Sequence, residues 1–268
     1  VILCERSPEQ AVQTNINGVQ NVISAADLNN VGVVIFTSSD KAVNPTNVMG
    51  TTKLMGERLM TAANSSKREN GPIFASTRFG NVLGSSGSVI PIFRNQISNG
   101  GPVTLTDKNM TRFVMSVKEA VELVLNSVIE AKGGEVFVTK MPVMRIEDLA
   151  IAMIEELCSK EMEITEIGSK PGEKLYEELM SEEETRRTIE LNKFFSVLPA
   201  FRGIYSDIKY NYSDIVSEIV NDPYVSEQQV SLTVEEVKSF LNDNNLLTTS
   251  DDNTEDTRYW PGDKEEKS

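Results

Sequence analysis

Short runs of apolar, mostly β-branched residues alternate along the chain with segments that repeat apolar residues at helical spacing. The run Val31–Phe36 is typical, because a helical pattern precedes it and another follows it. The pattern predicts strands at 31–36, 73–79, 103–106 and 135–139, and helices at 8–30, 47–63, 89–98, 117–131 and 146–157. Strands that alternate with helices favour a parallel sheet with helices on both faces, so we predict an α/β fold.

The alternation stops after residue 160, where shorter α+β elements are expected. Helices are predicted at 212–220 and 233–241, the second capped by Thr233 with Glu236 three residues later. Residues 248–268 hold seven acidic and three basic residues and few apolar ones, which is typical of a disordered tail. We therefore expect three regions, at 1–160, 161–247 and 248–268.

The composition excludes several kinds of chemistry. The chain has no histidine, which excludes Ser-His-Asp and Cys-His catalysis and removes the commonest metal ligand, so no metal site is expected. A net charge of −14 argues against a nucleic-acid partner. Cys4 and Cys158 are far apart and indicate a reducing compartment. We see no signal peptide or spanning run and expect a cytoplasmic protein, membrane-associated only through a segment upstream of Val1.

A polar cluster follows the strand predicted at 31–36. Thr37, Ser38, Ser39, Asp40 and Lys41 stand in sequence there. The carboxyl ends of strands in an open α/β sheet face the ligand crevice, so we expect this cluster to face a ligand.

The helix predicted after this cluster places Met49 and Lys53 four residues apart on one face. Short-chain dehydrogenases carry Tyr-x-x-x-Lys on this helix, and Met49 stands where they have tyrosine. The whole string 37–53 resembles the polysaccharide-biosynthesis branch of the extended short-chain dehydrogenase/reductase family, which includes UDP-N-acetylglucosamine 4,6-dehydratases. Further segments resemble motifs of that branch in the same order: 15–21, 78–84, 87–91, 111–115 and 170–178.

The family's phosphate-binding glycine loop has no counterpart in the sequence. No G-x-G-x-x-G occurs, and the resemblance places that loop before Val1. The resemblance therefore implies a partial Rossmann-like parallel sheet, its N-terminal strands missing, with a smaller α+β substrate-binding region. The implied cofactor is NADP or NAD, a choice that the missing residues would set.

The resemblance implies a redox-neutral reaction on a UDP-sugar. Hydride leaves sugar C4, water is lost across C5 and C6, and hydride returns to C6, with C5 inverted in this branch. Lys53 would hold the nicotinamide ribose and Ser39 the C4 oxygen. Asp40 would protonate the departing C6 oxygen while Lys41 takes the C5 proton; the opposite assignment stays open, because coupled groups share protons. Lys41 can act as a base only if burial lowers its pKa.

Because Met49 replaces the tyrosine, no base is assigned to the removal of the C4 hydroxyl proton. A thioether cannot take the proton of the C4 hydroxyl, so the catalytic set implied by the resemblance, which includes Met49, needs another base. Asp40, Lys41, a water molecule or, more weakly, Tyr176 remain open for this step.

The resemblance also implies the surrounding binding residues. Thr37, Ser38, Phe79 and Gly80 would contact the cofactor together with Lys53. Asn81 and Arg112 are candidates for the sugar-nucleotide diphosphate, since the planar fork of arginine suits phosphate. The remaining substrate candidates are Ser88 and Val89 along the nucleotide, Thr104 and Thr106 near the uracil, and Lys174 and Glu177 at a predicted turn and helix start.

The sequence leaves three functions open. The first is a C5-inverting UDP-N-acetylglucosamine 4,6-dehydratase that serves surface-glycan synthesis. The second is a UDP-sugar 4- or 5-epimerase of the same family, and the third is a catalytically silent sugar-nucleotide-binding fragment. In each case we expect a UDP-sugar ligand, no nucleic acid, and a homo-oligomer.

Overall fold

A six-stranded mixed sheet forms the centre of the computed structural model, which describes residues 1–84, 88–158, 160–168, 173–201 and 208–247. The strand order is β1-β2-β6-β11-β10-β12. The bounds are β1 Val33–Ser39, β2 Ile73–Phe79, β6 Val136–Thr139, β10 Thr188–Leu191, β11 Phe194–Val197 and β12 Ile215–Ser217. The first three strands run parallel and β11 pairs with β6 antiparallel. The predicted α/β class with a parallel sheet is confirmed.

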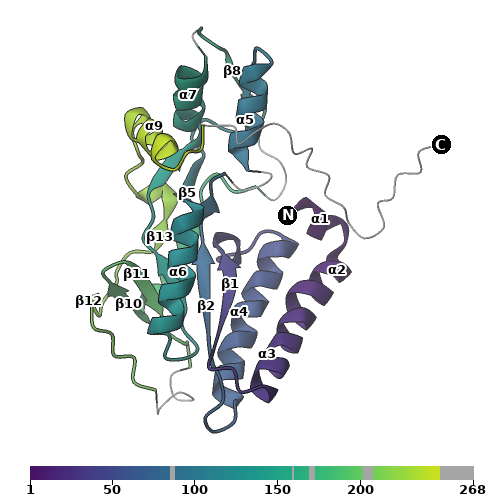
Figure 1. Ribbon diagram of the computed structural model, residues 1–268, viewed down its shortest axis with the longest axis vertical. Coiled ribbons are helices and arrows are strands. Elements are labelled where there is room, and N and C mark those ends of the chain that lie inside the picture. The colour runs from purple at the N-terminus through teal and green to yellow at the C-terminus, as the bar shows by residue number, and fades with distance from the viewer. Residues whose placement is uncertain (85–87, 159, 169–172, 202–207, 248–268) are drawn as a thin grey trace, which may run out of the picture.

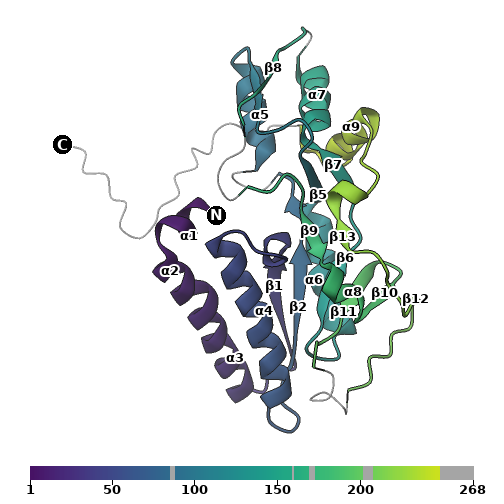
Figure 2. The same ribbon diagram turned by 180° about the vertical axis from the view of Figure 1, so that it is seen from behind.

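Helices cover both faces of the parallel strands (Figures 1 and 2). The segment before β1 comprises α1 Ile2–Arg6, α2 Pro8–Val12, the π-helical turn η1 Gln13–Asn17 and α3 Gly18–Leu28. The helices that contact the strands include α4 Val48–Ser66 and α6 Val117–Glu130. Side chains alternate along β2: Phe74 packs with α3 and α4, whereas Ala75 shares a core with Leu123 of α6. This alternation places one helical layer on each face.

Two features mark the surface of this layered unit in the described part of the chain. β1 is an edge strand of the sheet. The outer side of α6 exposes an apolar stripe whose members recur at helical spacing: Val117, Val121, Leu125, Val128 and Ile129.

A second unit stands at the carboxyl end of the parallel strands. Its strands are β3 Asn81–Val82, β4 Val103–Leu105, β5 Thr111–Met115, β7 Val143–Arg145 and β8 Ile164–Glu166, and its helices are α5 Val89–Ser98, α7 Ile146–Leu157 and α9 Val234–Asp243. β3, β5 and β7 form one small sheet, and β4 pairs with β8. A separate apolar core that includes Leu149 and Leu241 joins α7 to α9. None of the described helices is both long enough and apolar enough to cross a bilayer.

Most predicted elements are confirmed to within a few residues, including the α9 capping box of Thr233 and Glu236. The helix predicted at 212–220 is wrong. Residues 215–217 form β12, in which Ile215 pairs with Leu191 of β10. Tyr212, Ile215 and Val216 imitate helical spacing, but the pairing edge of β10 and the β-branched residues favour a strand.

The helix start predicted at Lys174–Glu177 is also wrong. A bend there leads into β9 Glu178–Met180, which pairs with β13 Tyr224–Val225. Strands β10 and β11 follow residue 160, yet they belong to the same sheet as β1, β2 and β6. The sheet therefore continues across the division predicted at residue 160. That division into regions stays a prediction. The predicted tail at 248–268 lies outside the described residues.

Candidate active site

The carboxyl end of β1 turns sharply into α4. Ser39 ends the strand, and residues Asp40–Ala42 form one 3₁₀ turn, η2. Asn47 caps α4 by accepting a hydrogen bond from the backbone N–H of Gly50 at 2.8 Å. A Cβ on Gly50 would lie 2.1 Å from the carbonyl oxygen of Lys41, so only glycine lets the helix start pack directly against the turn. This close approach fixes the direction of the polar cluster.

Asp40 is the centre of that cluster. Its Oδ1 accepts hydrogen bonds from the Ser39 hydroxyl at 2.6 Å and from Lys41 Nζ at 3.0 Å. The backbone N–H of Lys41 donates to the same oxygen at 2.8 Å. The side chain is buried, yet its other oxygen, Oδ2, has no hydrogen-bond partner. A carboxylate with one anchored and one unused oxygen can exchange a proton with a ligand.

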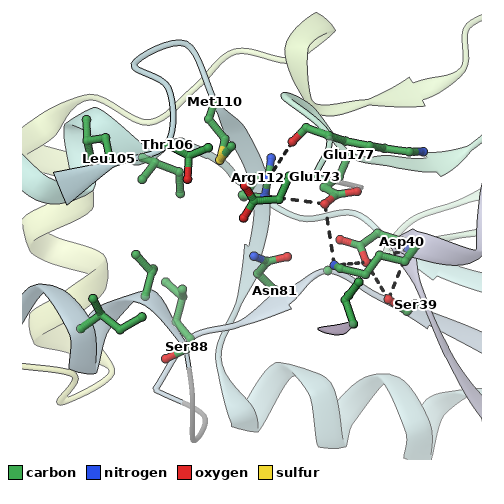
Figure 3. A pocket seen from close by; sticks show the side chains of 18 of the residues that line it. Ser39, Asp40, Asn81, Ser88, Leu105, Thr106, Met110, Arg112, Glu173 and Glu177 are labelled. Carbon is green, nitrogen blue, oxygen red and sulfur yellow. Dashed lines mark hydrogen bonds and ion pairs between the residues drawn. The ribbon is translucent and has the colours of Figure 1, made fainter. Parts of the chain in front are cut away.

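A second carboxylate comes from a distant part of the sequence. Glu177 precedes β9, and its Oε1 lies 3.7 Å from Lys41 Nζ and 3.6 Å from Arg112 Nε. Its Oε2 is buried and has no hydrogen-bond partner. Figure 3 shows the resulting row of interactions, which runs from Arg112 through Glu177 to Asp40 and Ser39. Lys41 therefore lies between two carboxylates.

This arrangement shifts the proton affinities of its members. Burial alone would lower the pKa of Lys41, but the charges of Asp40 and Glu177 outweigh it and the pKa ends above its ordinary value. Burial raises the pKa of Glu177, and the charge of Asp40 raises it further, against the opposing effect of Lys41 and Arg112. The lysine thus holds its proton while Glu177 gains affinity for one.

These groups face a cleft of about 800 Å³ between the two units, a size that suits a nucleotide-sized ligand. Its walls include twelve residues predicted from the sequence: Ser39, Asp40, Lys41, Gly80, Asn81, Ser88, Val89, Thr104, Thr106, Arg112, Lys174 and Glu177. In Figure 3, Asp40 and Glu177 lie at one end, and Thr106 and Ser88 at the other. The structure therefore brings most of the predicted site together.

Several of these wall residues already have protein partners. Arg112 donates to the backbone carbonyls of Lys174 at 2.8 Å and Leu175 at 3.2 Å. Lys174 Nζ donates to the carbonyl of Val43 at 3.0 Å. The Thr104 hydroxyl accepts a hydrogen bond from Gln96 at 2.7 Å. These contacts hold the walls in place, and the predicted ligand roles of Arg112, Lys174 and Thr104 stay predictions.

Five predicted residues do not line this cleft: Thr37, Ser38, Met49, Lys53 and Phe79. Lys53 Nζ donates to the carbonyl of Thr37 at 3.0 Å and lies 5.0 Å from the centre of the Phe36 ring. Burial lowers the pKa of Lys53. The Ser38 hydroxyl is buried without a hydrogen-bond partner. These residues lie beside the end of β1 rather than on the cleft wall.

Sequence reasoning missed other wall residues, which include Thr46, Asn47, Ile92, Phe93, Met110 and the first three residues of the chain. The sequence could have indicated Asn47, because an asparagine directly before a helical pattern is a typical helix cap. This cap lies close to the polar cluster in the chain. Phe93 and Met110 carried none, since apolar residues at core spacing give no sign that one side faces a ligand.

The fold and this site define the class of the protein. A parallel sheet layered by helices, with a Ser-Asp-Lys set at a strand end facing a ligand-sized cleft, is the architecture of Rossmann-type nucleotide-sugar enzymes of the extended short-chain dehydrogenase/reductase kind. Residues 1–199 match the family described as polysaccharide biosynthesis protein. The chain belongs to that family.

Known relatives carry different names. The chain is 52% identical over 205 residues to an "uncharacterized membrane protein" of Methanocaldococcus jannaschii, covering 74% of this chain and 62% of that one. It is 39% identical over 208 residues to the UDP-N-acetylglucosamine 4,6-dehydratase (inverting) of Campylobacter jejuni, with coverages of 77% and 61%. It is 38% identical over 238 residues to the UDP-glucose 4-epimerase of Rickettsia canadensis, with coverages of 89% and 69%. The chain thus spans about six-tenths to seven-tenths of these relatives' lengths.

Solved structures agree on the fold. Pen from Bacillus thuringiensis superposes with a TM-score of 0.82 at 43% identity, covering 91% of this chain and 72% of that chain. The UDP-glucose 4-epimerase of Thermus thermophilus in complex with NAD superposes with a TM-score of 0.55 at 19% identity, covering 64% and 62%. The second likeness shows the shared fold alone.

Proposed function

We propose that this chain contributes the catalytic and sugar-binding part of a C5-inverting UDP-N-acetylglucosamine 4,6-dehydratase. The observation that carries the proposal is Asp40, which lines the cleft and whose one carboxylate oxygen contacts both Ser39 and Lys41 while the other is buried without a hydrogen-bond partner. Dehydration needs an acid for the C6 oxygen beside a base for the C5 proton, and this cluster supplies groups of both kinds. The similarity to the Campylobacter jejuni dehydratase supports the same reaction.

The residues beside β1 fit the nicotinamide end of a cofactor. The orphaned Ser38 hydroxyl and the amine of Lys53 are the polar groups that would hold its ribose and amide. We propose NADP or NAD as the cofactor; the Thermus thermophilus epimerase was solved in complex with NAD. When bound there, the cofactor would supply hydride-transfer chemistry for sugar C4 and C6. No G-x-G-x-x-G occurs in the 268 residues to hold its pyrophosphate.

The sugar nucleotide is proposed to lie along the cleft. The amino terminus of α5 opens on the cleft at Ser88 and Val89, and such a helix end favours a diphosphate. The Ser88 hydroxyl is buried there without a hydrogen-bond partner. Asn81 and Arg112 stand between this end and Asp40, so a diphosphate at α5 would direct the sugar toward the polar cluster.

Incubating the protein with UDP-N-acetylglucosamine and NAD tests the proposal. We expect a product lighter than the substrate by one water, detected by mass spectrometry. An Asp40→Asn variant should lower its formation by about 10²–10⁴-fold with substrate binding retained. A product of unchanged mass contradicts dehydration.

The second candidate is a UDP-sugar 4-epimerase, which the similarity to the Rickettsia canadensis protein favours. Epimerisation leaves the mass unchanged and alters the configuration at C4, which nuclear magnetic resonance detects. If neither product forms and calorimetry still shows binding of UDP-N-acetylglucosamine, the chain is a sugar-nucleotide-binding fragment.

A further inference from the structure

The chemistry that Lys41 can perform depends on where its amine is held. A lysine ammonium ion is a point charge on a flexible stem, so a single contact does not fix its position. Asp40 contacts Lys41 Nζ at 3.0 Å, but both residues belong to the same short turn, η2. The Lys41 side chain is 27% exposed and borders the cleft. Holding the amine in one direction therefore needs a second contact from outside this turn.

Glu177 supplies that second contact. Its Oε1 lies 3.7 Å from Lys41 Nζ, on the side of the cleft where Lys41 stands. The Glu177 side chain is only 4% exposed, and its Oε2 is buried without a hydrogen-bond partner. Because so little of this carboxylate reaches the cleft, it acts on its protein neighbours rather than directly on a ligand.

Glu177 is itself fixed from two sides. Arg112 of β5 places its Nε 3.6 Å from Oε1, and its terminal nitrogens donate to the backbone carbonyls of Lys174 and Leu175. The backbone N–H of Glu177 donates to the hydroxyl of Ser226 at 2.9 Å, and Ser226 is fully buried. These contacts hold both the backbone and the side chain of Glu177, so its carboxylate has a defined direction.

The segment that carries Glu177 is also tied to the chain just after η2. Lys174 Nζ donates to the carbonyl of Val43 at 3.0 Å and pairs with Glu178 at 3.2 Å. The side-chain amide of Asn44 donates to the same Glu178 carboxylate at 3.0 Å. The turn and this distant segment are thus joined at several points, which fixes the distance between the lysine and its second carboxylate.

We propose that Glu177 is a positioning residue that holds the Lys41 ammonium ion beside Asp40 on the cleft wall. The inference rests on the proposed dehydratase function, in which the Asp40–Lys41 pair supplies an acid and a base. It adds to that pair a residue that acts through Lys41 and does not touch the reacting atoms.

The charges around Lys41 give the proposal a measurable consequence. The charged groups that face Lys41 in the described part of the chain are Asp40, Glu177 and Arg112. Burial and the charge of Arg112 lower the pKa of Lys41, whereas the two carboxylates raise it, and the pKa ends above its ordinary value. Without the charge of Glu177, Asp40 alone opposes burial and Arg112. The pKa of Lys41 should then fall.

Titration of Lys41 itself tests the contact without any substrate. In protein that contains isotopically labelled lysine, the nuclear magnetic resonance signal of Cε moves as the ammonium ion loses its proton, and the signal missing in Lys41→Arg is that of Lys41. Glu177→Gln keeps the shape of the side chain without its charge, and its Lys41 midpoint should fall by about 1–3 pH units from the parent value. Glu177→Asp keeps the charge on a shorter side chain and should lie between the two.

The neighbouring carboxylate offers a matched control. Glu178→Gln changes the same segment, but Glu178 pairs with Lys174 rather than with Lys41. This variant should leave the Lys41 midpoint at the parent value. Thermal melting of each variant checks folding.

Turnover tests whether the reaction uses the contact. With UDP-N-acetylglucosamine and NAD, Glu177→Gln should lower kcat by about 10–10²-fold with little change in KM, because the sugar still binds while a misplaced amine transfers protons poorly. Glu190→Gln alters a partly exposed pair with Lys140 outside the cleft and should behave as the parent protein.

Each outcome bears on a different statement. If the Lys41 midpoint in Glu177→Gln equals that of the parent, or falls equally in Glu178→Gln, the positioning role is overturned while the proposed function stands. A lowered midpoint with an unchanged kcat also overturns it, because the reaction then does not depend on the contact. If the parent protein forms no dehydrated product, the proposed function fails, and the titration alone decides whether Glu177 holds Lys41.

Discussion

At the scale of residues, the cluster at the end of β1 could be predicted, but its most unusual contact could not. Ser39, Asp40 and Lys41 are adjacent in the chain, and a strand followed by a helix fixes which edge of the sheet they occupy. Glu177 reaches the same point from another region, through a bend before β9. Its contact with Lys41 depends on tertiary packing, which no local pattern encodes.

Met49 allows a direct test at this scale. It is half-buried in the first turn of α4, four residues before Lys53. In Met49→Tyr the Lys53 cation would lower the pKa of the new phenol, so the phenol could take the C4 hydroxyl proton. We expect turnover to be preserved or raised, as measured by product formation. Met49→Phe, which has the ring without the hydroxyl, is the control, and an inactive Met49→Tyr enzyme with intact binding would sink the idea.

At the scale of elements, one arginine joins three segments. Arg78 of β2 is 1% exposed, and its guanidinium makes paired hydrogen bonds of 2.8–2.9 Å with Glu57 of α4 and 2.8 Å with Glu184. Glu184 belongs to α8, which spans Glu182–Thr185. Arg78 also donates to the carbonyl of Leu179 in β9 at 2.9 Å. Arg78 therefore fixes α4, which follows the polar cluster, and β9, which follows Glu177, relative to β2.

Replacing this arginine should be costly. Arg78→Met would leave the buried Glu57 without its counter-ion and Glu184 with only its 3.5 Å contact to Arg187, so we expect a loss of about 3–5 kcal/mol in the free energy of unfolding. Urea denaturation followed by circular dichroism measures it. Arg68→Met is the control, because Arg68 pairs with Asp27 on the surface and should change stability by at most about 1 kcal/mol. Equal losses of unfolding free energy in the two variants would contradict this stabilising role of Arg78.

The buried pair of Arg78 and Glu184 also predicts that the stability of the protein depends on pH. Burial would raise the pKa of Glu184, but the charge of Arg78 outweighs it and lowers the pKa to about 2. A carboxyl with a depressed folded pKa stabilises the protein above its unfolded value and loses that contribution as the pH falls through the folded pKa. The contribution should therefore be complete above about pH 4.5 and vanish toward pH 2. In the Glu184→Gln variant, the urea midpoint should fall less steeply with decreasing pH over that interval. A slope equal to that of the parent protein would contradict this role of Glu184.

The capping box of α9 gives a further prediction. The Thr233 hydroxyl accepts from the backbone N–H of Glu236 at 3.3 Å, and the Glu236 carboxylate accepts from the backbone N–H of Thr233 at 2.8 Å. Thr233→Ala removes the first bond and should cost about 1 kcal/mol. Thr233→Ser keeps a hydroxyl and should retain most of the stability. Thermal melting checks both, and equal melting of the two variants would show that the cap contributes nothing.

At the scale of the whole molecule, the parallel strands and most of the helices were predictable, and the shortest strands were not. Strands β2 and β6 are largely buried and β1 is half-buried, and each contains a short apolar run that the local pattern reveals. β3 has two residues and β12 has three, so no periodicity can show them, and their pairing partners lie far along the chain. The cleft arises between the units, and the expected homo-oligomer stays a prediction.

The exposed apolar stripe of α6 has a consequence for any laboratory measurement. Apolar side chains exposed along one face of a helix favour association with another chain. The specific activity of this chain should therefore be measured at several protein concentrations before any rate is assigned to a single molecule.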